Sequence, residues 1–394
     1  MNSIDYWYNT VTKNECVTKT PLSSFIKNEQ PNIISATFER ACNLQCAHCI
    51  YPQDTLSKEL SEKYKFNEVI TNLISQISVD KNPILIHEGR IILPRHIEIL
   101  KNLKINHPKV KIGLIDNGTY IKVLKHIKTA KLEFDWLDIS IDGLKETHNQ
   151  QRDPIYKKSW NQAIEGLANA KEIVKKNGRV STLMTLSILN YLDISKLADY
   201  LLGNNNILID ELHITPMVPK QPNNYAVNLD QTAFDTVWSQ FKEIFKKYNT
   251  ESKYKCFFKM YNIEDITKLA KSVGLSNIQN AILGINTNKP PILHNGSITF
   301  FIENIPITYF PSSIWPQESI FIDADVTYRV AYAHQFTLRQ LRMKPELKKF
   351  TVTQITPESN LQEIYEQTVD HWWQYFGKEF LQKEQEIFKA ILEK

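Results

Sequence analysis

Residues 33–49 read IISATFERACNLQCAHC, and this stretch decides which fold we expect. Residues 33–39 are predicted to form a β-strand. Cys42, Cys46 and Cys49 follow on the loop at the carboxyl end of that strand. Thiolates that are separated by three and two residues can converge on one soft metal centre. The stretch therefore predicts a metal-binding loop directly after the first strand.

The number of thiols in this loop distinguishes the candidate metal sites. A structural zinc ion takes four closed ligands, whereas a cubane iron–sulfur cluster that three Cys hold leaves one iron open to an external ligand. An open iron suits chemistry on a bound molecule, so we favour the cluster. Two alternatives stay open. In the first, the three Cys lie close together in the sequence by chance. In the second, His48 completes a zinc site, although its place between Cys46 and Cys49 is cramped for that role.

Strands and helices alternate along the chain from residue 33 to residue 216. Six short apolar segments are predicted to be strands, and helices separate them. These segments are residues 33–39, 84–86, 110–115, 134–141, 180–188 and 211–216. The alternation predicts a parallel α/β sheet with right-handed crossovers, either open or closed into a partial barrel. In both cases function lies at the carboxyl ends of the strands.

The pattern changes after residue 217. Residues 218–224 read VPKQPNN, which is typical of a linker. Helices are predicted at residues 232–248, 262–284 and 361–394, and strands at residues 297–302, 319–322 and 326–331. We therefore divide the chain into an N-terminal lead-in of residues 1–30, an α/β part of residues 31–217 and a C-terminal α+β part of residues 218–394.

Composition excludes several classes of function. The 394 residues carry 47 Lys and Arg against 43 Asp and Glu, a net charge of +4, which favours neither nucleic-acid nor membrane binding. Five Cys, of which three are clustered, do not make a disulfide framework. The 11 Gly form neither a Rossmann nor a P-loop motif. Without a signal-peptide pattern or a long apolar run, we expect a soluble cytoplasmic protein whose thiols stay reduced.

Several motifs in order resemble the radical S-adenosylmethionine (SAM) superfamily. The spacing of Cys42, Cys46 and Cys49 is the hallmark of that family. Residues 115–119 (IDNGT) resemble the end of its third strand, and residues 136–143 (WLDISIDG) its fourth strand. His148, Arg152 and residues 161–171 (NQAIEGLANAK) resemble the loop and helix that follow. The resemblance covers about residues 33–217 and implies a partial (β/α)6 barrel with a C-terminal α+β extension.

The segment after the second strand departs from the family pattern. The family usually has Gly-Gly-Glu-Pro there, whereas residues 86–90 read IHEGR. The resemblance implies that Glu88 binds the methionine amino group of SAM. Loss of the glycines changes how closely the backbone can approach the cofactor. The alternative for Glu88 is a solvated loop carboxylate.

The resemblance also implies the cofactors and their contacts. Cys42, Cys46 and Cys49 would hold one [4Fe–4S] cluster, whose open iron binds SAM. Reductive cleavage of SAM would give a 5′-deoxyadenosyl radical that abstracts hydrogen from a substrate. The expected SAM contacts lie on the cluster loop and at strand carboxyl ends: His48, Glu88, Asn117, Ser140, Arg152, Thr185, Ser187 and Thr215. Asp142 shares a strand face with Ser140, and we interpret it as a turn residue before Gly143.

The two remaining thiols are interpreted separately. Cys256 is the only Cys after the barrel, so no auxiliary cluster is expected. It is a candidate hydrogen donor to a substrate radical, as in epimerases of this superfamily. The alternative is a buried apolar Cys next to Phe257 and Phe258. Cys16 has no neighbours that indicate chemistry.

The substrate is the least constrained part of the prediction. The fourth-strand region most resembles peptide maturases, so the leading hypothesis is modification of a ribosomally made peptide. The alternatives are a small natural product, such as a sugar or nucleoside, that is dehydrated, decarboxylated or epimerised, and a non-enzymatic metal-binding scaffold. An electron donor of the flavodoxin or ferredoxin type is the expected protein partner.

Overall fold

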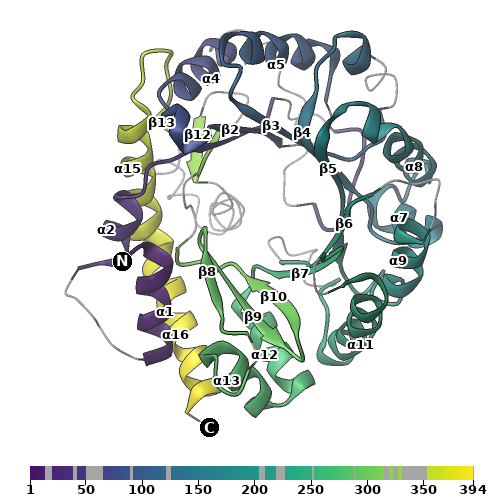
Figure 1. The fold of residues 1–394 in the computed structure, drawn as a ribbon, viewed down its shortest axis with the longest axis vertical. Helices are drawn as coiled ribbons and strands as arrows, with labels where there is room; N and C mark the ends of the chain where they lie inside the picture. Colours follow the sequence, from purple (N-terminus) through teal and green to yellow (C-terminus); the bar gives the residue numbers. More distant parts are fainter. Residues whose placement is uncertain are drawn as a thin grey trace.

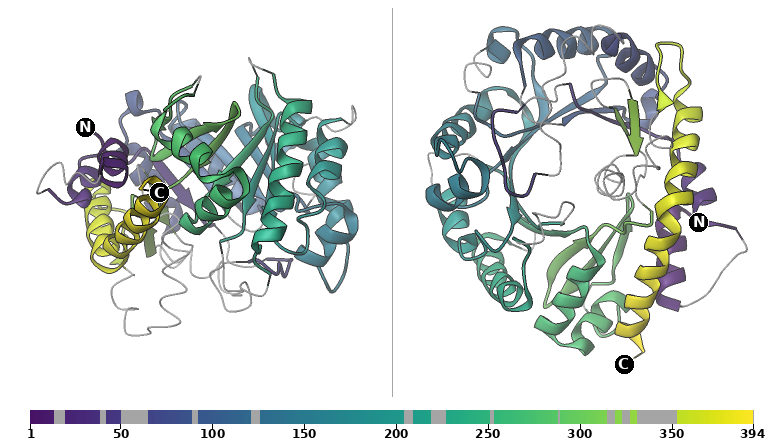
Figure 2. Two further views of the ribbon diagram at one scale, coloured as in Figure 1. Left: turned by 90° about the horizontal axis from the view of Figure 1, so that it is seen from below. Right: turned by 180° about the vertical axis from the view of Figure 1, so that it is seen from behind.

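A single curved sheet with helices outside it forms the body of the molecule (Figure 1). The structure, a computed structural model, describes residues 1–13, 20–38, 42–49, 65–88, 92–120, 126–203, 209–218, 227–250, 253–287, 289–314, 319–322, 327–330 and 353–393. Two further views show the same arrangement, with strands inside and helices outside (Figure 2). No helix in these ranges is long and apolar enough to cross a membrane.

The six strands predicted from the sequence are all present and pair in parallel in chain order. They are β1 (Ile33–Ala36), β2 (Ile84–Glu88), β3 (Lys111–Asp116), β4 (Phe134–Ser140), β5 (Val174–Leu186) and β6 (Glu211–Pro216). The helices between them are α4 (Phe66–Ser75), α5 (Pro94–Asn106), α7 (Lys145–Arg152), α8 (Ser159–Asn169) and α9 (Ile194–Leu202), with short 3-10 turns η1 (Val79–Lys81) and η2 (Ala170–Glu172). The predicted partial barrel is confirmed.

The sheet does not end at residue 217. Strands β7 (Cys256–Met260) and β10 (Ile305–Tyr309) continue it in parallel after β6, and β9 (Ser297–Ile302) and β8 (Ile292–His294) add antiparallel edges. At the other edge β11 (Ser319–Ile322) pairs in parallel with β1, followed by antiparallel β12 (Thr327–Val330) and β13 (Thr353–Gln354). The C-terminal strands thus extend the barrel sheet on both sides. Helices α11 (Gln231–Tyr248), α12 (Ile263–Val273) and α13 (Leu275–Leu283) lie outside β7 to β10.

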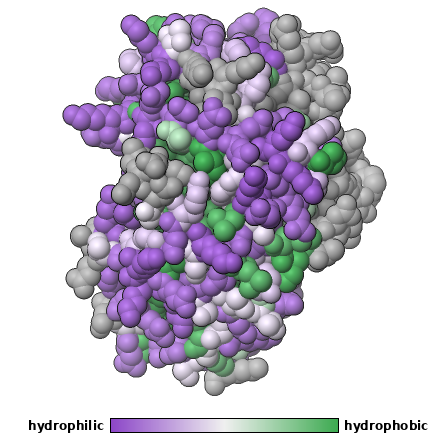
Figure 3. All heavy atoms as spheres, turned by 90° about the vertical axis from the view of Figure 1, so that its right-hand side faces the viewer, coloured by the Kyte–Doolittle hydropathy of each residue, from purple (hydrophilic) through white to green (hydrophobic). Residues whose placement is uncertain are grey.

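The two faces of the strands differ in exposure. On β7, Cys256, Phe258 and Met260 are fully buried, while Phe257 and Lys259 between them are partly exposed. Phe258 packs against aromatic side chains of α11, so the buried set faces the helices and the alternating set faces the inside of the barrel. The outer surface over α7, α8, α9 and α11 is mostly hydrophilic (Figure 3). The helices therefore bury their apolar sides against the sheet.

The two ends of the chain pack together between the sheet edges. Helix α1 (Ser3–Lys13) contacts both α16 (Lys378–Leu392) and β8, while α15 (Leu361–Trp372) contacts α2 (Leu22–Lys27) and β12. A π-helical turn, η4 (Trp373–Gly377), joins α15 to α16. The first 30 residues, predicted as a lead-in segment, thus contribute helices α1 and α2 to the body (Figure 1).

Glu384 of α16 is the central hydrogen-bond acceptor in the region where the two ends of the chain pack together. Its carboxylate is 1% exposed and accepts hydrogen bonds from Trp7 Nε1 at 2.8 Å, from Tyr309 Oη at 2.9 Å, and from the Ser313 hydroxyl. The Ser312 amide donates a further bond at 2.7 Å. One side chain therefore connects α1, α16, β10 and the turn after β10.

Replacing Glu384 by Ala should destabilise the fold by roughly 3–5 kcal/mol, because several buried donors lose their acceptor at once. Urea unfolding, followed by circular dichroism, measures this loss. Glu386→Ala on the exposed side of the same helix is the matched control and should cost less than about 0.5 kcal/mol. Equal effects of the two substitutions would contradict the role given to Glu384.

A buried histidine pair makes the fold sensitive to acid. His87 Nε2 lies 3.2 Å from His96 Nδ1 between β2 and α5, and Phe38 stacks on the His87 ring. Burial lowers the pKa of His87 to about 4, and burial together with the positive charges nearby lowers that of His96 to about 2. An unfolded histidine has a pKa of about 6.5, so the unfolded chain binds more protons below that pH and folding stability is lost as the pH falls.

The free energy of unfolding should therefore decline by up to about 1.4 kcal/mol per histidine for each pH unit between pH 6.5 and about 4.5. Urea titrations at pH 7.5, 6.5 and 5.5 measure the slope. The double variant His87→Leu, His96→Leu should reduce this slope, whereas His126→Gln at an exposed position should not. If the double variant has the same pH slope as the wild type, the buried histidine pair is not the source of the acid sensitivity.

Candidate active site

The cysteine loop is anchored to the end of helix α7 through its backbone. The Gln45 amide donates to the Arg152 carbonyl at 3.2 Å, and the Ala47 amide donates to the Gln151 carbonyl at 2.7 Å. Within the loop, the Cys49 amide donates to the Cys46 carbonyl at 3.0 Å, which closes a turn. The position of the thiols therefore depends on the last turn of α7.

A second anchor lies at the carboxyl end of β3. Asn117 Nδ2 donates to Asn43 Oδ1 at 2.9 Å and lies 3.8 Å from Cys42 Sγ. Asn43 Nδ2 in turn donates to Thr119 Oγ1 at 2.8 Å. The structure thus gives Asn117, predicted either to contact SAM or to make a turn, the task of holding the cysteine loop.

The turn that carries Asn117 allows no side chain at its contact with α8. Gly118 adopts a φ of +73°, which favours glycine. A Cβ on Gly166 of α8 would lie 2.3 Å from the Gly118 carbonyl oxygen. Gly118 and Gly166 therefore allow α8 to pack closely against this turn.

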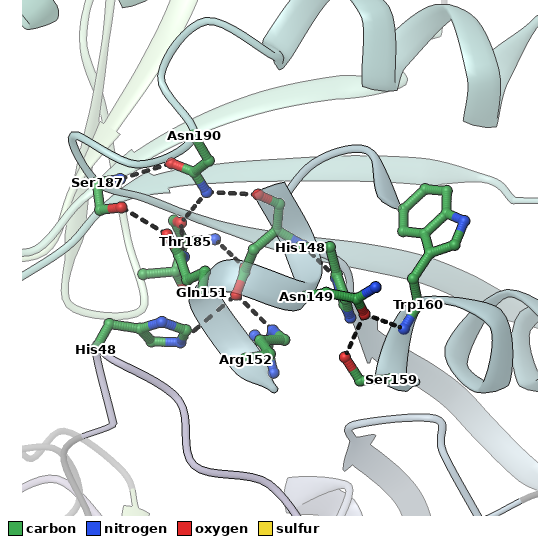
Figure 4. A network of polar contacts seen from close by, with 11 residues as sticks. His48, His148, Asn149, Gln151, Arg152, Ser159, Trp160, Thr185, Ser187 and Asn190 are labelled. Carbon is green, nitrogen blue, oxygen red and sulfur yellow. Dashed lines mark hydrogen bonds and ion pairs between the residues drawn. The ribbon is translucent and has the colours of Figure 1, made fainter. Parts of the chain in front are cut away.

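Asp142 is the centre of the network that joins the loop to the barrel, and its partners His48, Arg152 and Thr185 are labelled in Figure 4. Its carboxylate is fully buried and accepts a hydrogen bond from Arg152 Nε through Oδ2 and one from the Thr185 amide through Oδ1 at 2.8 Å. His48 Nε2 lies 3.7 Å from Oδ2. Burial alone would raise the pKa of Asp142, but the charge of Arg152 and the hydrogen bond that Arg152 donates hold this pKa below its usual value. The interpretation of Asp142 as only a turn residue was wrong.

His48 lies against this carboxylate as a neutral ring. Burial lowers the pKa of His48 to about 4. At neutral pH, therefore, its approach to Asp142 is not an ion pair. Because His48 Nε2 lies 3.7 Å from the Asp142 carboxylate, the structure gives no support to the alternative in which His48 completes a zinc site with the thiols.

Gln151 and Asn190 extend the network to the end of β5. Gln151 Nε2 and Asn190 Nδ2 both donate to the Thr185 carbonyl at 2.8 Å, and Ser187 Oγ donates to Gln151 Oε1 at 2.5 Å. Ser187 is fully buried, so its hydroxyl supports the network, whereas we had predicted a contact with the SAM ribose. The sequence reasoning missed Gln151 and Asn190. Helix α7 reads KETHNQQR, and a wholly polar helix gives no amphipathic signal for which side is buried.

Three of the predicted SAM contacts carry partly exposed hydroxyl groups that are not part of this network. Ser140, Thr185 and Thr215 are partly exposed near the carboxyl ends of β4, β5 and β6, and the Thr185–Thr215 pair is in register. Within the described residues none of the three hydroxyls makes a hydrogen bond. Glu88, at the end of β2, accepts a hydrogen bond from the Ser35 hydroxyl of β1. Gly89 and Arg90 lie outside the described residues.

Cys256 points away from this site. It is fully buried on the helix-facing side of β7, within the hydrophobic core, and burial raises the pKa of its thiol to about 12. The expectation of a hydrogen donor is therefore corrected, because the strand alternation directs this side chain outward. The alternative reading, a buried apolar Cys, agrees with the structure. Cys16 lies outside the described residues.

The donor set of the loop fits a cluster. Cys42, Cys46 and Cys49 are partly exposed thiols, and the positive charge of Arg152 lies near Cys42 and Cys46. Burial raises the pKa of Cys46 to about 12, and Arg152 opposes that rise. Across the described residues, no three His, Cys, Asp or Glu side chains are arranged to hold a single metal ion. Three soft thiol donors beside a guanidinium suit a larger, anionic iron–sulfur cluster.

Comparison with known proteins agrees with this geometry. Residues 37–201 match the family model described as the radical SAM superfamily. This part of the chain belongs to the radical SAM superfamily. The chain therefore carries the domain of a radical SAM enzyme, and the cofactors of that family are a [4Fe–4S] cluster and SAM. No curated protein matches the sequence closely enough to count as a relative.

Solved structures share the fold at low sequence identity. Hexahistidine-tagged anSMEcpe with bound AdoMet has a TM-score of 0.55 and 14% identity, over 87% of this chain and 82% of that chain. Native anSMEcpe with bound AdoMet and Cp18Cys peptide has a TM-score of 0.53 and 14% identity, over 86% and 81%. Streptococcus suis SuiB bound to precursor peptide SuiA has a TM-score of 0.53 and 9% identity, over 86% and 66%. At these identities the likeness concerns the fold of this radical SAM enzyme.

Proposed function

We propose that this radical SAM enzyme modifies a peptide, with one cluster bound by Cys42, Cys46 and Cys49. When bound, the cluster would supply the electron for reductive cleavage of SAM, the chemistry by which this family abstracts hydrogen from a substrate. The loop thiols hold the cluster while the backbone anchors to α7 fix their position. The observation that carries the proposal is a loop of three thiols anchored at strand carboxyl ends inside a radical SAM fold.

The three partly exposed hydroxyl groups near the strand ends are proposed to contact SAM. Ser140, Thr185 and Thr215 face the inside of the barrel near the level at which the strands end. We assign them to the ribose and carboxylate of SAM, and Glu88 to its amino group. Arg152 is assigned mainly to balancing charge, because Asp142 and the thiols surround it.

The choice of a peptide substrate is supported by the structures with a similar fold. AnSMEcpe was solved with a Cp18Cys peptide, and SuiB with its precursor peptide SuiA. A protein reductant of the flavodoxin or ferredoxin type would supply the electron, and reduced, clustered thiols suit the cytoplasm.

The assay follows 5′-deoxyadenosine formation under anaerobic conditions. Reconstituted protein with dithionite and SAM should form it. A peptide encoded by a short reading frame next to this gene should increase the rate, and its own mass should change. If no more 5′-deoxyadenosine forms than in a control without protein, the proposed enzymatic activity is contradicted. Stimulation by sugars or nucleosides instead of the peptide would contradict the peptide substrate.

A further inference from the structure

Charged side chains gather on the inner face of the barrel, on β4 to β7. Asp138, Arg179 and Glu211 come from three neighbouring strands, and Arg179 bridges the two carboxylates with N···O distances of 3.5 and 3.2 Å. His213 Nε2 lies 2.7 Å from Glu211 Oε2. Ion pairs are uncommon inside a barrel unless they serve a purpose, because desolvation is costly.

Lys259 of β7 joins this group without an ion pair of its own. It alternates with the buried Phe258 and Met260, so it faces inward, and the charges of Asp138, Arg179 and Glu211 act on it. Within the described residues no carboxylate oxygen lies close enough to its ammonium group to form an ion pair or hydrogen bond. Arg179 and His213 already engage the two nearby carboxylates. The ammonium donors of Lys259 are therefore left to another partner.

Other polar atoms in the same place lack hydrogen bonds, although Asp138 Oδ1 lies 3.5 Å from the Arg179 guanidinium. Asp138 is 6% exposed and His213 is 4% exposed, yet Asp138 Oδ1 and His213 Nδ1 make no hydrogen bond. The fully buried Ser181, in register between Asp138 and Glu211, has an unpartnered hydroxyl. Buried polar groups are nearly always satisfied. The Arg179 side chain retains 39% of its accessible surface, so this inner face can be reached from solvent.

We propose that Lys259 binds a carboxylate of the substrate on the inner face of the barrel. His213 Nδ1 and the Ser181 hydroxyl offer acceptors for neighbouring N–H groups, so the ligand combines an anionic group with amide donors. A peptide with an acidic side chain, or with its free C-terminal carboxylate, meets this description. The inference rests on the proposed function in taking the inside of the barrel as the place of the substrate.

The protonation of Lys259 gives this interaction a pH dependence. Burial lowers the pKa of Lys259 to about 8, while Asp138 and Glu211 raise it and Arg179 lowers it. The ring of His213 on β6 also lies within reach of the Lys259 charge, and Thr308 is the uncharged neighbour of Lys259 on β10. Because only the ammonium form attracts an anion, carboxylate binding should weaken as the pH rises above about 8.

The test uses two pairs of blocked alanine pentapeptides with the reconstituted enzyme. One pair differs in a central Glu or Gln, and the other in a C-terminal acid or amide. At pH 7, calorimetry should show about tenfold tighter binding of the acid in one of these pairs, which identifies the source of the carboxylate. Lys259→Met should remove the preference and Lys259→Arg should retain it. Lys253→Met, at an exposed position just before β7, is the matched control and should behave as wild type.

Equal or undetectable binding of the acid and amide peptides would overturn the inference, as would a preference that survives in Lys259→Met. Circular dichroism shows whether that variant is folded, and recovery in Lys259→Arg separates charge from packing. The same preparations are assayed for 5′-deoxyadenosine. Cleavage of SAM without a carboxylate preference contradicts only this inference, and a preference without cleavage contradicts only the proposed function.

Discussion

Replacing Cys46 by Ala should abolish both iron binding and the formation of 5′-deoxyadenosine. Cys46 stands in the middle of the three loop thiols, and its carbonyl closes the turn with the Cys49 amide. Two thiols cannot hold a cubane cluster that needs three protein ligands and leaves one iron for SAM. Colorimetric iron analysis and chromatography of the nucleoside product measure the two losses in one anaerobic preparation.

The matched control for this substitution is Cys256→Ala. Cys256 lies in the core on the helix-facing side of β7, so its loss should leave the iron content and nucleoside formation near the wild-type level. It should cost stability alone, by about 1 kcal/mol for a small cavity. Loss of iron in Cys256→Ala, or retention of iron in Cys46→Ala, would contradict the assignment of the ligands.

Replacing Asp142 by Ala should reduce nucleoside formation about 10–100-fold, although Asp142 binds no cluster iron in this account. The substitution leaves the Arg152 guanidinium buried without its carboxylate, and the Arg152 carbonyl anchors the cysteine loop. The stability cost should be roughly 3–5 kcal/mol, the range for breaking one side of a buried ion pair. Asp142→Asn, which keeps an acceptor for the Thr185 amide, should lie between Ala and wild type.

A double variant distinguishes packing from positioning. Asp142→Leu with Arg152→Met removes both charges, so it should recover much of the stability lost in Asp142→Ala but not the activity. Urea unfolding and the nucleoside assay measure the two quantities separately. Asp80→Ala, at an exposed position in η1, is the control and should change neither. Full activity in the double variant would show that Asp142 has no positioning role.

The strand–helix alternation was enough to predict the parallel core. Its signal is local, since short apolar strands alternate with helices, and all six strands occur where they were expected. Strands β7 and β10 were missed because nothing local distinguishes CFFKM or IPITY from a buried loop segment. The place of β7 next to β6, and of β10 next to β7, is fixed by tertiary contacts with α11 and β9. The extension of the sheet beyond residue 217 was therefore not predictable from local pattern.

In the site, too, the cysteine motif can be recognised from the local sequence, whereas the roles of other residues depend on partners far away in the chain. The cysteine spacing is a local motif and needs no fold to be recognised. The tasks of Asp142, Asn117 and Ser187 depend on partners that are 36–75 residues away, namely Thr185, Cys42 and Gln151. Lys259 gives no sequence signal at all, since a lone lysine in a strand is usually solvated. Only the inward face of β7 brings it to Asp138 and Glu211.

The central claim is that three loop thiols hold one cluster whose open iron binds SAM. Electron paramagnetic resonance of the dithionite-reduced wild-type protein, recorded with and without SAM, tests it most directly. We predict about four irons per chain, a reduced-cluster signal, and a clear change of that signal when SAM is added. A protein that carries zinc in place of iron, or a cluster signal that SAM leaves unchanged, would contradict the account.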